Sequence, residues 1–358
     1  MPKSPRLPPP VGSLTNTGSL RAFDGTTLLL LNPADGAVQN AGGTILADGE
    51  GSRVEISATI AGGTFQTTNG GRIVAGQLIM DGTTDAVTNE GIVEVLYSGY
   101  IGLRGDIINS GAFNLVGRNH IVLSGDTTLS GGGAITLQDG FETSTITTGV
   151  TGAEFVNVDN RISGSGQIGS TYYYGVMNGL QLINGAGGSI VADRSGEILL
   201  VRTGVTITNN GVFQADGGIL TLKDHIIGSG IINVTNGGTV IIDSDVDADV
   251  SFSGDSHDLL QLYKDGADET YDFSISGMGV GDRIQLQRYG DEGTVNDFVL
   301  TYTDDGADLT GIFDYRYGET LHLEGEYSEG QFRLIAGDDR WFDFVRVETQ
   351  DGTAGTIH

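Results

Sequence analysis

The stretch Asn209-Asn-Gly-Val-Phe-Gln-Ala-Asp-Gly-Gly-Ile-Leu-Thr-Leu222 predicts two short β-strands joined at tight corners. Residues 212–215 and 219–222 are rich in apolar side chains, and strand geometry sends every second one to the same face. Asp216-Gly-Gly suits the corner between them. Asn209-Asn-Gly suits the preceding corner, because Asn and Gly best tolerate left-handed backbone. The stretch therefore has the composition of one coil of a β-solenoid.

The Asn-x-Gly pattern that opens this stretch recurs along the chain. Its occurrences begin at Asn16, Asn40, Asn69, Asn89, Asn109, Asn209 and Asn236. The first five occurrences stand 20 to 29 residues apart, and the last two stand 27 residues apart. A period in the twenties, built from short strands and turns, is typical of a solenoid, in which each coil contacts only its neighbours.

Three internal matches support the repeat. Residues 60–74 align without gaps on 227–241, residues 41–48 on 186–193, and residues 107–113 on 207–213. The pattern is weaker from about residue 127 to 179, which predicts a loop or an irregular coil there. The repeated Asn residues have two interpretations: they stack into a hydrogen-bonded ladder, or each forms a turn by itself.

Composition narrows the classes of protein. Glycine contributes 59 of 358 residues, more than twice the usual share of about 7%, and proline only 6. We expect the glycines to serve positive φ at tight corners. The net charge of −28 makes nucleic acid and anionic lipid poor partners. No long apolar run occurs, so we expect no membrane insertion, and without Cys there are no disulfides or thiolate metal sites.

The chain divides into three predicted regions of an all-β protein. Residues 1–12 form a flexible Pro-rich head. Residues 13–250 form a parallel, right-handed β-helix. Residues 251–358 form an acidic antiparallel β-rich domain that caps the helix, since they hold 15 of the 26 aromatic residues and hairpin signals such as Asp304-Asp-Gly306.

One acidic run is a candidate metal site. Asp243, Asp245, Asp247 and Asp249 alternate with other residues, so an extended backbone places all four carboxylates on one side. Calcium prefers such oxygen ligands, which makes Ca²⁺ the expected cofactor if a cation binds. The alternative is a solvated acidic linker.

Two tyrosine clusters are candidate ligand or interface residues. Tyr172, Tyr173 and Tyr174 could form a platform on which a sugar stacks, or could pack over a loop or a subunit contact. Tyr315 and Tyr317 have the composition of an interface patch, although a core strand is an equal alternative.

Catalysis has weak support. Polysaccharide-cleaving enzymes need paired carboxylates on one face, and residues 13–250 hold none of the motifs seen in pectin-degrading β-helices. We interpret Asp224-His225 as a corner pair in solvent and assign no catalytic residue.

The Asn-x-Gly coils resemble secreted β-helical repeat proteins of Gram-negative bacteria, of the adhesin and autotransporter-passenger type. The segment 273–286 is similar to a Gly-Phe-x-x-Gly-Asp-x-Ile-x-Leu element of such proteins, with Asp282 at the Asp position. The resemblance implies a β-helix and export to the cell surface.

These observations predict a non-enzymatic extracellular protein: an adhesin, or a matrix or filament subunit that self-associates head to tail through its solenoid ends. A glycan-binding or glycan-cleaving β-helix that contacts cell-surface glycan is the second hypothesis. A trimeric phage tail fibre or depolymerase is the third.

Overall fold

The computed structural model describes residues 13–33, 36–138, 143–169, 179–254, 257–264, 273–288, 298–313, 316–327, 331–339 and 342–349. Within these ranges every regular element is a β-strand, and most neighbouring strands pair in parallel, one coil on the next. The predicted all-β parallel solenoid is therefore confirmed. The chain forms two compact units, residues 1–160 and 161–358, which are described in turn.

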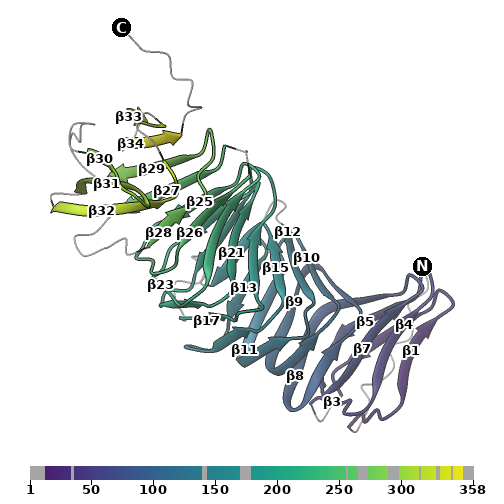
Figure 1. Ribbon diagram of the computed structural model, residues 1–358. Coiled ribbons are helices and arrows are strands. Elements are labelled where there is room, and N and C mark those ends of the chain that lie inside the picture. Colours follow the sequence, from purple (N-terminus) through teal and green to yellow (C-terminus); the bar gives the residue numbers. More distant parts are fainter. Residues whose placement is uncertain are drawn as a thin grey trace. The chain divides into compact units, whose positions relative to one another are not determined.

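The N-terminal unit winds through three sides per coil. Its strands are β1 (Ser19–Phe23), β2 (Thr27–Leu31), β3 (Val38–Gln39), β4 (Thr44–Asp48), β5 (Arg53–Ser57), β6 (Thr59–Ala61), β7 (Gly63–Thr68), β8 (Arg72–Asn89), β9 (Ile92–Asn109), β10 (Ala112–Val116), β11 (His120–Ser130), β12 (Ala134–Gln138), β13 (Thr145–Thr148) and β14 (Glu154–Asn157). One side is β1–β4–β7, side by side in Figure 1. The others run β2–β5–β8–β9–β10–β12 and β3–β6–β8–β9–β11–β13.

The core is a set of columns, each made of one inward residue per coil. Register places Val54, Ile73, Val93, Phe113 and Ile135 directly over one another, and all five are fully buried. Burying such a side chain stabilises the fold by about 1.5–3 kcal/mol. The alternation seen in the sequence thus becomes a continuous hydrophobic core.

The irregular coil expected from residue 127 onward is not found where the structure describes the chain. β13 pairs with β11 in parallel, and β14 pairs with the end of the same strand. Thr-rich residues 145–148 fit a coil because Ile146 fills the core position while Thr147 faces outward. Residues 170–178 lie outside the described residues.

Most of the repeated Asn residues form buried ladders, as one of the two interpretations predicted. Asn16 Nδ2 donates to Asn40 Oδ1 at 2.7 Å. Asn89 Nδ2 donates to Asn109 Oδ1 at 2.7 Å, and Asn109 Nδ2 donates to Asn160 Oδ1 at 2.8 Å. Asn89 Oδ1 also accepts the amide of Gly91 at 3.2 Å, so each side chain joins its own corner to the next coil.

The glycine of this motif provides space for the ladder. A Cβ on Gly111 would lie 2.0 Å from the carbonyl oxygen of Gly91, and a Cβ on Gly91 would lie 2.6 Å from the backbone nitrogen of Thr67. Neither glycine has positive φ. The expectation that glycine serves positive φ is therefore wrong at these two corners, where the close approach of the adjacent coil excludes a side chain. It is confirmed at Gly42 of the same motif, whose φ is 71° and whose Cβ position is open.

Asn69 and Asn236 differ from the ladder residues and follow the other interpretation. Their φ angles are 51° and 57°, in the left-handed region, and each is followed by two glycines. Asn69 Nδ2 donates to Asp48 Oδ1 at 2.8 Å, and Asn236 Nδ2 donates to Asp216 Oδ1 at 2.5 Å. The match of residues 60–74 with 227–241 therefore reflects one corner geometry used in both units.

The C-terminal unit repeats this construction. Its strands are β15 (Arg161–Gly164), β16 (Gly166–Gly169), β17 (Gln181–Asn184), β18 (Ser189–Ala192), β19 (Ile198–Arg202), β20 (Ile207–Asn209), β21 (Val212–Asp216), β22 (Ile219–Leu222), β23 (Ile226–Ile227), β24 (Ile231–Thr235), β25 (Thr239–Ile242), β26 (Val250–Ser253), β27 (Leu259–Lys264), β28 (Ser274–Ser276), β29 (Arg283–Arg288), β30 (Phe298–Tyr302), β31 (Gly306–Phe313), β32 (Arg316–Glu324), β33 (Phe332–Asp339) and β34 (Phe342–Thr349). Asn184 donates to Asn209 at 2.8 Å as a further ladder.

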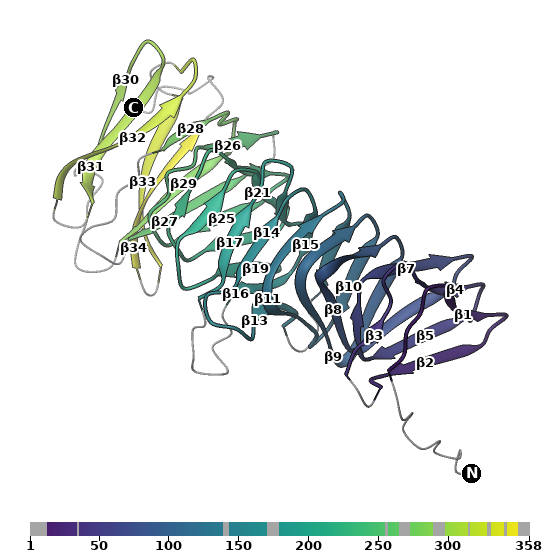
Figure 2. The same cartoon turned by 90° about the horizontal axis from the view of Figure 1, so that it is seen from below.

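Parallel pairing passes the boundary predicted near residue 250. β27 pairs with β25, and β29 pairs with β27 up to Arg288. Antiparallel strands follow: β30, β31 and β32 pair in order and lie side by side in Figure 2, and β34 pairs with β33. β32 also pairs with β28, and β34 with β29. The β28–β32 pairing is parallel and the β29–β34 pairing is antiparallel, so β32 and β34 occupy the outer edges of β28 and β29. The role of residues 251–358 as a cap stays a prediction.

We predict that the Asn109→Ala substitution lowers the free energy of unfolding by about 2–3 kcal/mol, because it removes the buried donor to Asn160 Oδ1 and leaves Asn89 Nδ2 with only the long bond to the Ala112 carbonyl at 3.4 Å. Urea denaturation measures the change. Asn114→Ala, on the outward face of β10, is the control and should change stability by less than about 0.5 kcal/mol. Equal losses in the two variants would refute the role of the ladder.

We predict that Gly111→Ala destabilises the protein by about 1–3 kcal/mol through overpacking against the adjacent coil. The matched variant is Gly125→Ala, whose Cβ would meet nothing closer than Arg104 Cβ at 3.5 Å. Its denaturation midpoint should stay near that of the parent protein. If Gly111→Ala is tolerated equally well, clearance is not the reason for glycine in the motif.

Candidate ligand-binding hollow

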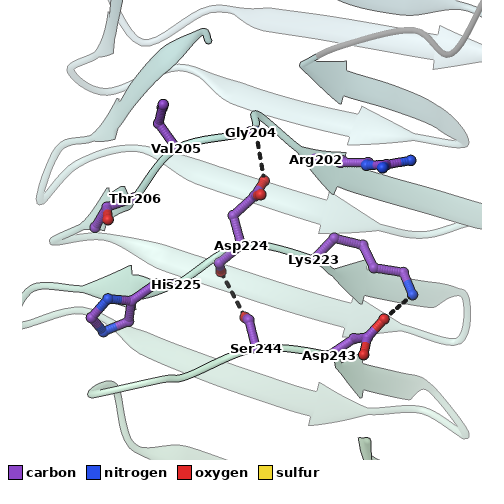
Figure 3. A pocket seen from close by; sticks show the side chains of 9 residues that line it. All are labelled: Arg202, Gly204, Val205, Thr206, Lys223, Asp224, His225, Asp243 and Ser244. Carbon is purple, nitrogen blue, oxygen red and sulfur yellow. Dashed lines mark hydrogen bonds and ion pairs between the residues drawn. The ribbon is translucent and has the colours of Figure 1, made fainter. Parts of the chain in front are cut away.

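A polar hollow of about 560 Å³ lies at one corner of the C-terminal unit, where β19, β22 and β25 end. It is lined by Arg202, Gly204, Val205, Thr206, Lys223, Asp224, His225, Asp243 and Ser244 (Figure 3). Coil register builds it, because Val201 lies beside Leu222 and Leu222 beside Ile242. The residues that directly follow these three therefore form a column across three coils: Arg202, Lys223 and Asp243.

Asp224 holds the hollow together. Its Oδ2 accepts hydrogen bonds from the backbone amide of Thr203, from the Thr203 hydroxyl at 3.2 Å and from the Gly204 amide at 3.1 Å. Its carbonyl oxygen accepts the Ser244 hydroxyl at 2.8 Å. The corner pair predicted from the sequence is therefore half-buried at Asp224 and fixed to the preceding coil.

Lys223 and His225 each lie beside a carboxylate of the next coil. Lys223 Nζ forms an ion pair with Asp243 Oδ2, as Figure 3 shows. His225 Nε2 lies 3.5 Å from Asp247 Oδ1. Thr206 and His225 lie on the opposite side of the hollow from Lys223 (Figure 3). The hollow thus combines neutralised charges with hydroxyl and imidazole groups, which suits hydrogen bonding to a polar ligand.

The four predicted calcium ligands do not converge. Asp243, Asp245, Asp247 and Asp249 face outward along an extended segment, as their alternation predicted, while Ser244, Val246 and Ala248 face inward. Lys223 pairs with Asp243, and Asp249 Oδ1 accepts the Ser274 amide at 3.0 Å. Among the described residues, no group of three or more His, Asp or Glu side chains is arranged to hold a metal ion. Calcium binding stays a prediction.

The structure leaves the aromatic candidates untested. Tyr172, Tyr173, Tyr174 and Tyr315 lie outside the described residues. Tyr317 belongs to β32, where its backbone is placed opposite Ile312 of β31. Their roles as ligand or interface residues therefore stay predictions.

Arg202, Thr206, Lys223 and Ser244 were not predicted as site residues. The signal that could have found them is the coil period, since Arg202, Lys223 and Asp243 stand 21 and 20 residues apart. A period predicts adjacency only when the register is known. Corners of unequal length, such as 203–206 and 223–225, conceal that register in the sequence.

Asp282, the aspartate of the Gly-Phe-x-x-Gly-Asp-x-Ile-x-Leu resemblance, does not line the hollow. It is fully buried, and it accepts the amides of Gly279 at 2.8 Å and Asp258 at 2.9 Å. Asp258 in turn accepts the amides of Gly237 and Gly238. Burial raises the pKa of Asp282. The two aspartates thus join successive corners, as Asp224 does.

No protein-family model matches the chain, and a search of curated proteins finds no similar sequence. Within the described residues, no helix has the length and hydropathy to cross a membrane.

One His–Asp pair in the cap yields a pH-dependent prediction. His322 Nδ1 lies 2.7 Å from Asp308 Oδ1 on the adjacent strand, and this hydrogen bond raises the pKa of His322 above its usual value near 6.5. The pair therefore stabilises the fold fully below about pH 6.5, and this contribution is lost as pH rises through the raised pKa.

We predict that Asp308→Asn lowers the pKa of His322 in an NMR titration and reduces stability by less than about 1 kcal/mol at acidic pH, with no loss at alkaline pH, because both groups are one-third exposed. His120, whose pKa is lowered by burial, is the internal control and should titrate unchanged. An unchanged His322 titration would contradict the assigned cause.

Proposed function

We propose that this protein is a non-enzymatic extracellular scaffold with an adhesive function, and that the corner hollow binds a neutral glycan of a cell surface. The resemblance to secreted β-helical surface proteins supports the extracellular setting. The stacked coils support the scaffold role, since a solenoid presents long, repetitive surfaces on a rigid core.

The hydrogen bonding of Asp224 is the observation that carries the proposal. Glycoside hydrolysis needs two carboxyl groups about 5–10 Å apart, one of which gives up a proton to the leaving group. Asp224 accepts two backbone amides and a hydroxyl through Oδ2, so this oxygen is engaged in fixing the side chain to the fold. Asp243 is neutralised by Lys223. These carboxylates suit binding better than acid catalysis.

Charge decides which glycan suits the hollow. The chain carries a net charge of −28, which repels an acidic polysaccharide at long range. Two cations, Arg202 and Lys223, and two carboxylates, Asp224 and Asp243, line the hollow, so its formal charges balance and do not offset that repulsion. Hydroxyl and imidazole groups can donate hydrogen bonds to sugar hydroxyls and accept hydrogen bonds from them, and carboxylates can accept them. A neutral, hydroxyl-rich glycan therefore fits best.

We predict that a glycan array shows binding to neutral oligosaccharides, and that calorimetry with the best ligand gives about fivefold to tenfold weaker binding for His225→Ala and for Thr206→Ala, as expected for one lost hydrogen bond each. Arg72→Ala serves as control, because Arg72 is a 65% exposed side chain in the N-terminal unit. That variant should bind like the parent protein.

A parallel assay for released reducing ends distinguishes binding from cleavage. We expect no release from bound glycans. Release that Asp224→Asn abolishes would overturn the proposal in favour of a glycan-cleaving enzyme. Binding only to acidic glycans, or binding unaffected by both hollow variants, would also contradict it.

A further inference from the structure

In the part of the chain that the structure describes, the first coil of the N-terminal unit has two strands with an unpaired outer edge. Among the described strands, β1 pairs only with β4 and β2 only with β5. The inward side chains Leu20 and Leu28 are half-exposed, whereas Ile45 and Val54, which occupy the same columns in the next coil, are fully buried. Ala22 and Leu30, the other inward residues of β1 and β2, are 1% and 5% exposed, so the core is open to solvent at this end only around Leu20 and Leu28.

The free edge of β2 can pair with another strand. The backbone amide of Arg53 donates to the Thr26 carbonyl at 2.9 Å. In a parallel ladder, alternate residues direct both their amide and their carbonyl to the same neighbouring strand. The amide and carbonyl of Leu29 therefore point away from β5. β2 has the sequence TLLLL, without charge or proline, and Leu29 and Leu31 are 55% and 54% exposed. Edge strands that avoid pairing usually carry Lys, Pro or a bulge. β2 has none of these.

The end of the C-terminal unit differs. β28 and β29 have neighbours on both edges: β28 lies between β26 and β32, both parallel to it, and β29 lies between parallel β27 and antiparallel β34. β32 in turn pairs with antiparallel β31 on its other edge. Head-to-tail growth would require a free parallel edge at this end to receive the first coil of another copy. The described strands leave that edge occupied.

We infer that a second copy of this chain covers the first coil head to head, with β2 of the two copies paired antiparallel about a twofold axis at Leu29. This arrangement uses the same surface twice, so it closes as a dimer and does not propagate. Leu29 then faces Leu29 of the partner and exchanges both backbone hydrogen bonds with it.

The number of residues in the first coil (residues 13–40, called here the rim) suits an interface with a second copy. Of the 26 described residues among 13–40, 20 are accessible to solvent, and a standard interface uses about 20–30 residues on each side. The preceding twelve residues are a poor alternative cover, because five of them are prolines, which cannot donate to a β-ladder. The inference does not depend on glycan binding.

Sedimentation equilibrium tests the proposal on the full chain. We predict a species of about twice the 37.4 kDa chain mass. Leu29→Pro removes the edge-facing amide without removing a bond to β5, and it should weaken the dimer at least about tenfold. Leu31→Lys adds an edge charge and should act in the same direction. Val116→Lys, at a 51% exposed position of β10, is the control and should remain dimeric.

Circular dichroism of each variant verifies that the fold persists, so a monomeric Leu29→Pro variant with a parent-like spectrum supports the proposal. A chain lacking residues 1–12 should also dimerise. A monomeric parent protein, a trimer, open-ended filaments, or a dimer unaffected by both rim variants would overturn it.

Discussion

The structure depends on the distance between adjacent coils at the corners, where backbone meets backbone. Parallel strands lie about 4.8 Å apart, and at the Asn-x-Gly corner this spacing leaves no room for a Cβ at Gly91 or Gly111. The same closeness brings Asn89, Asn109 and Asn160 within hydrogen-bond distance of one another. Glycine and asparagine therefore act as a pair: one permits the approach, and the other satisfies the polar groups that the approach buries.

A second rule governs the other corners, where aspartates accept backbone or side-chain hydrogen bonds from the adjacent coil. Asp224 accepts amides from residues 203 and 204, and Asp258 accepts amides from residues 237 and 238. This use explains part of the acidic composition without a cation or a catalytic role. It also gives the hollow its shape, because Asp224 fixes the loop that carries Thr206 beside the column formed by Arg202, Lys223 and Asp243.

A solenoid must manage its two ends, and this protein treats them differently. β32 and β34 cover the last parallel coil, and the inward residues Ile275 and Ile284 are fully buried beneath them. At the first coil, Leu20 and Leu28 keep part of their surface exposed and β2 keeps a free, uncharged edge. An exposed strand edge invites pairing with another chain unless it is twisted, charged or covered. The edges of β28 and β29 are covered by β32 and β34, whereas the edge of β2 has no such protection.

By itself, the sequence determined the coil, the alternation of its core and the residues of its corners, because these follow from local backbone preference and from a period of two along each strand. It also indicated that Asn69 and Asn236 occupy equivalent corners. Tertiary structure alone decided which Asn residues stack, why Gly111 is glycine, and that Arg202, Lys223 and Asp243 line one hollow. These features depend on the register between coils, and register is set by corner lengths that vary from coil to coil, so residues about 20 positions apart become neighbours only once the coils have stacked.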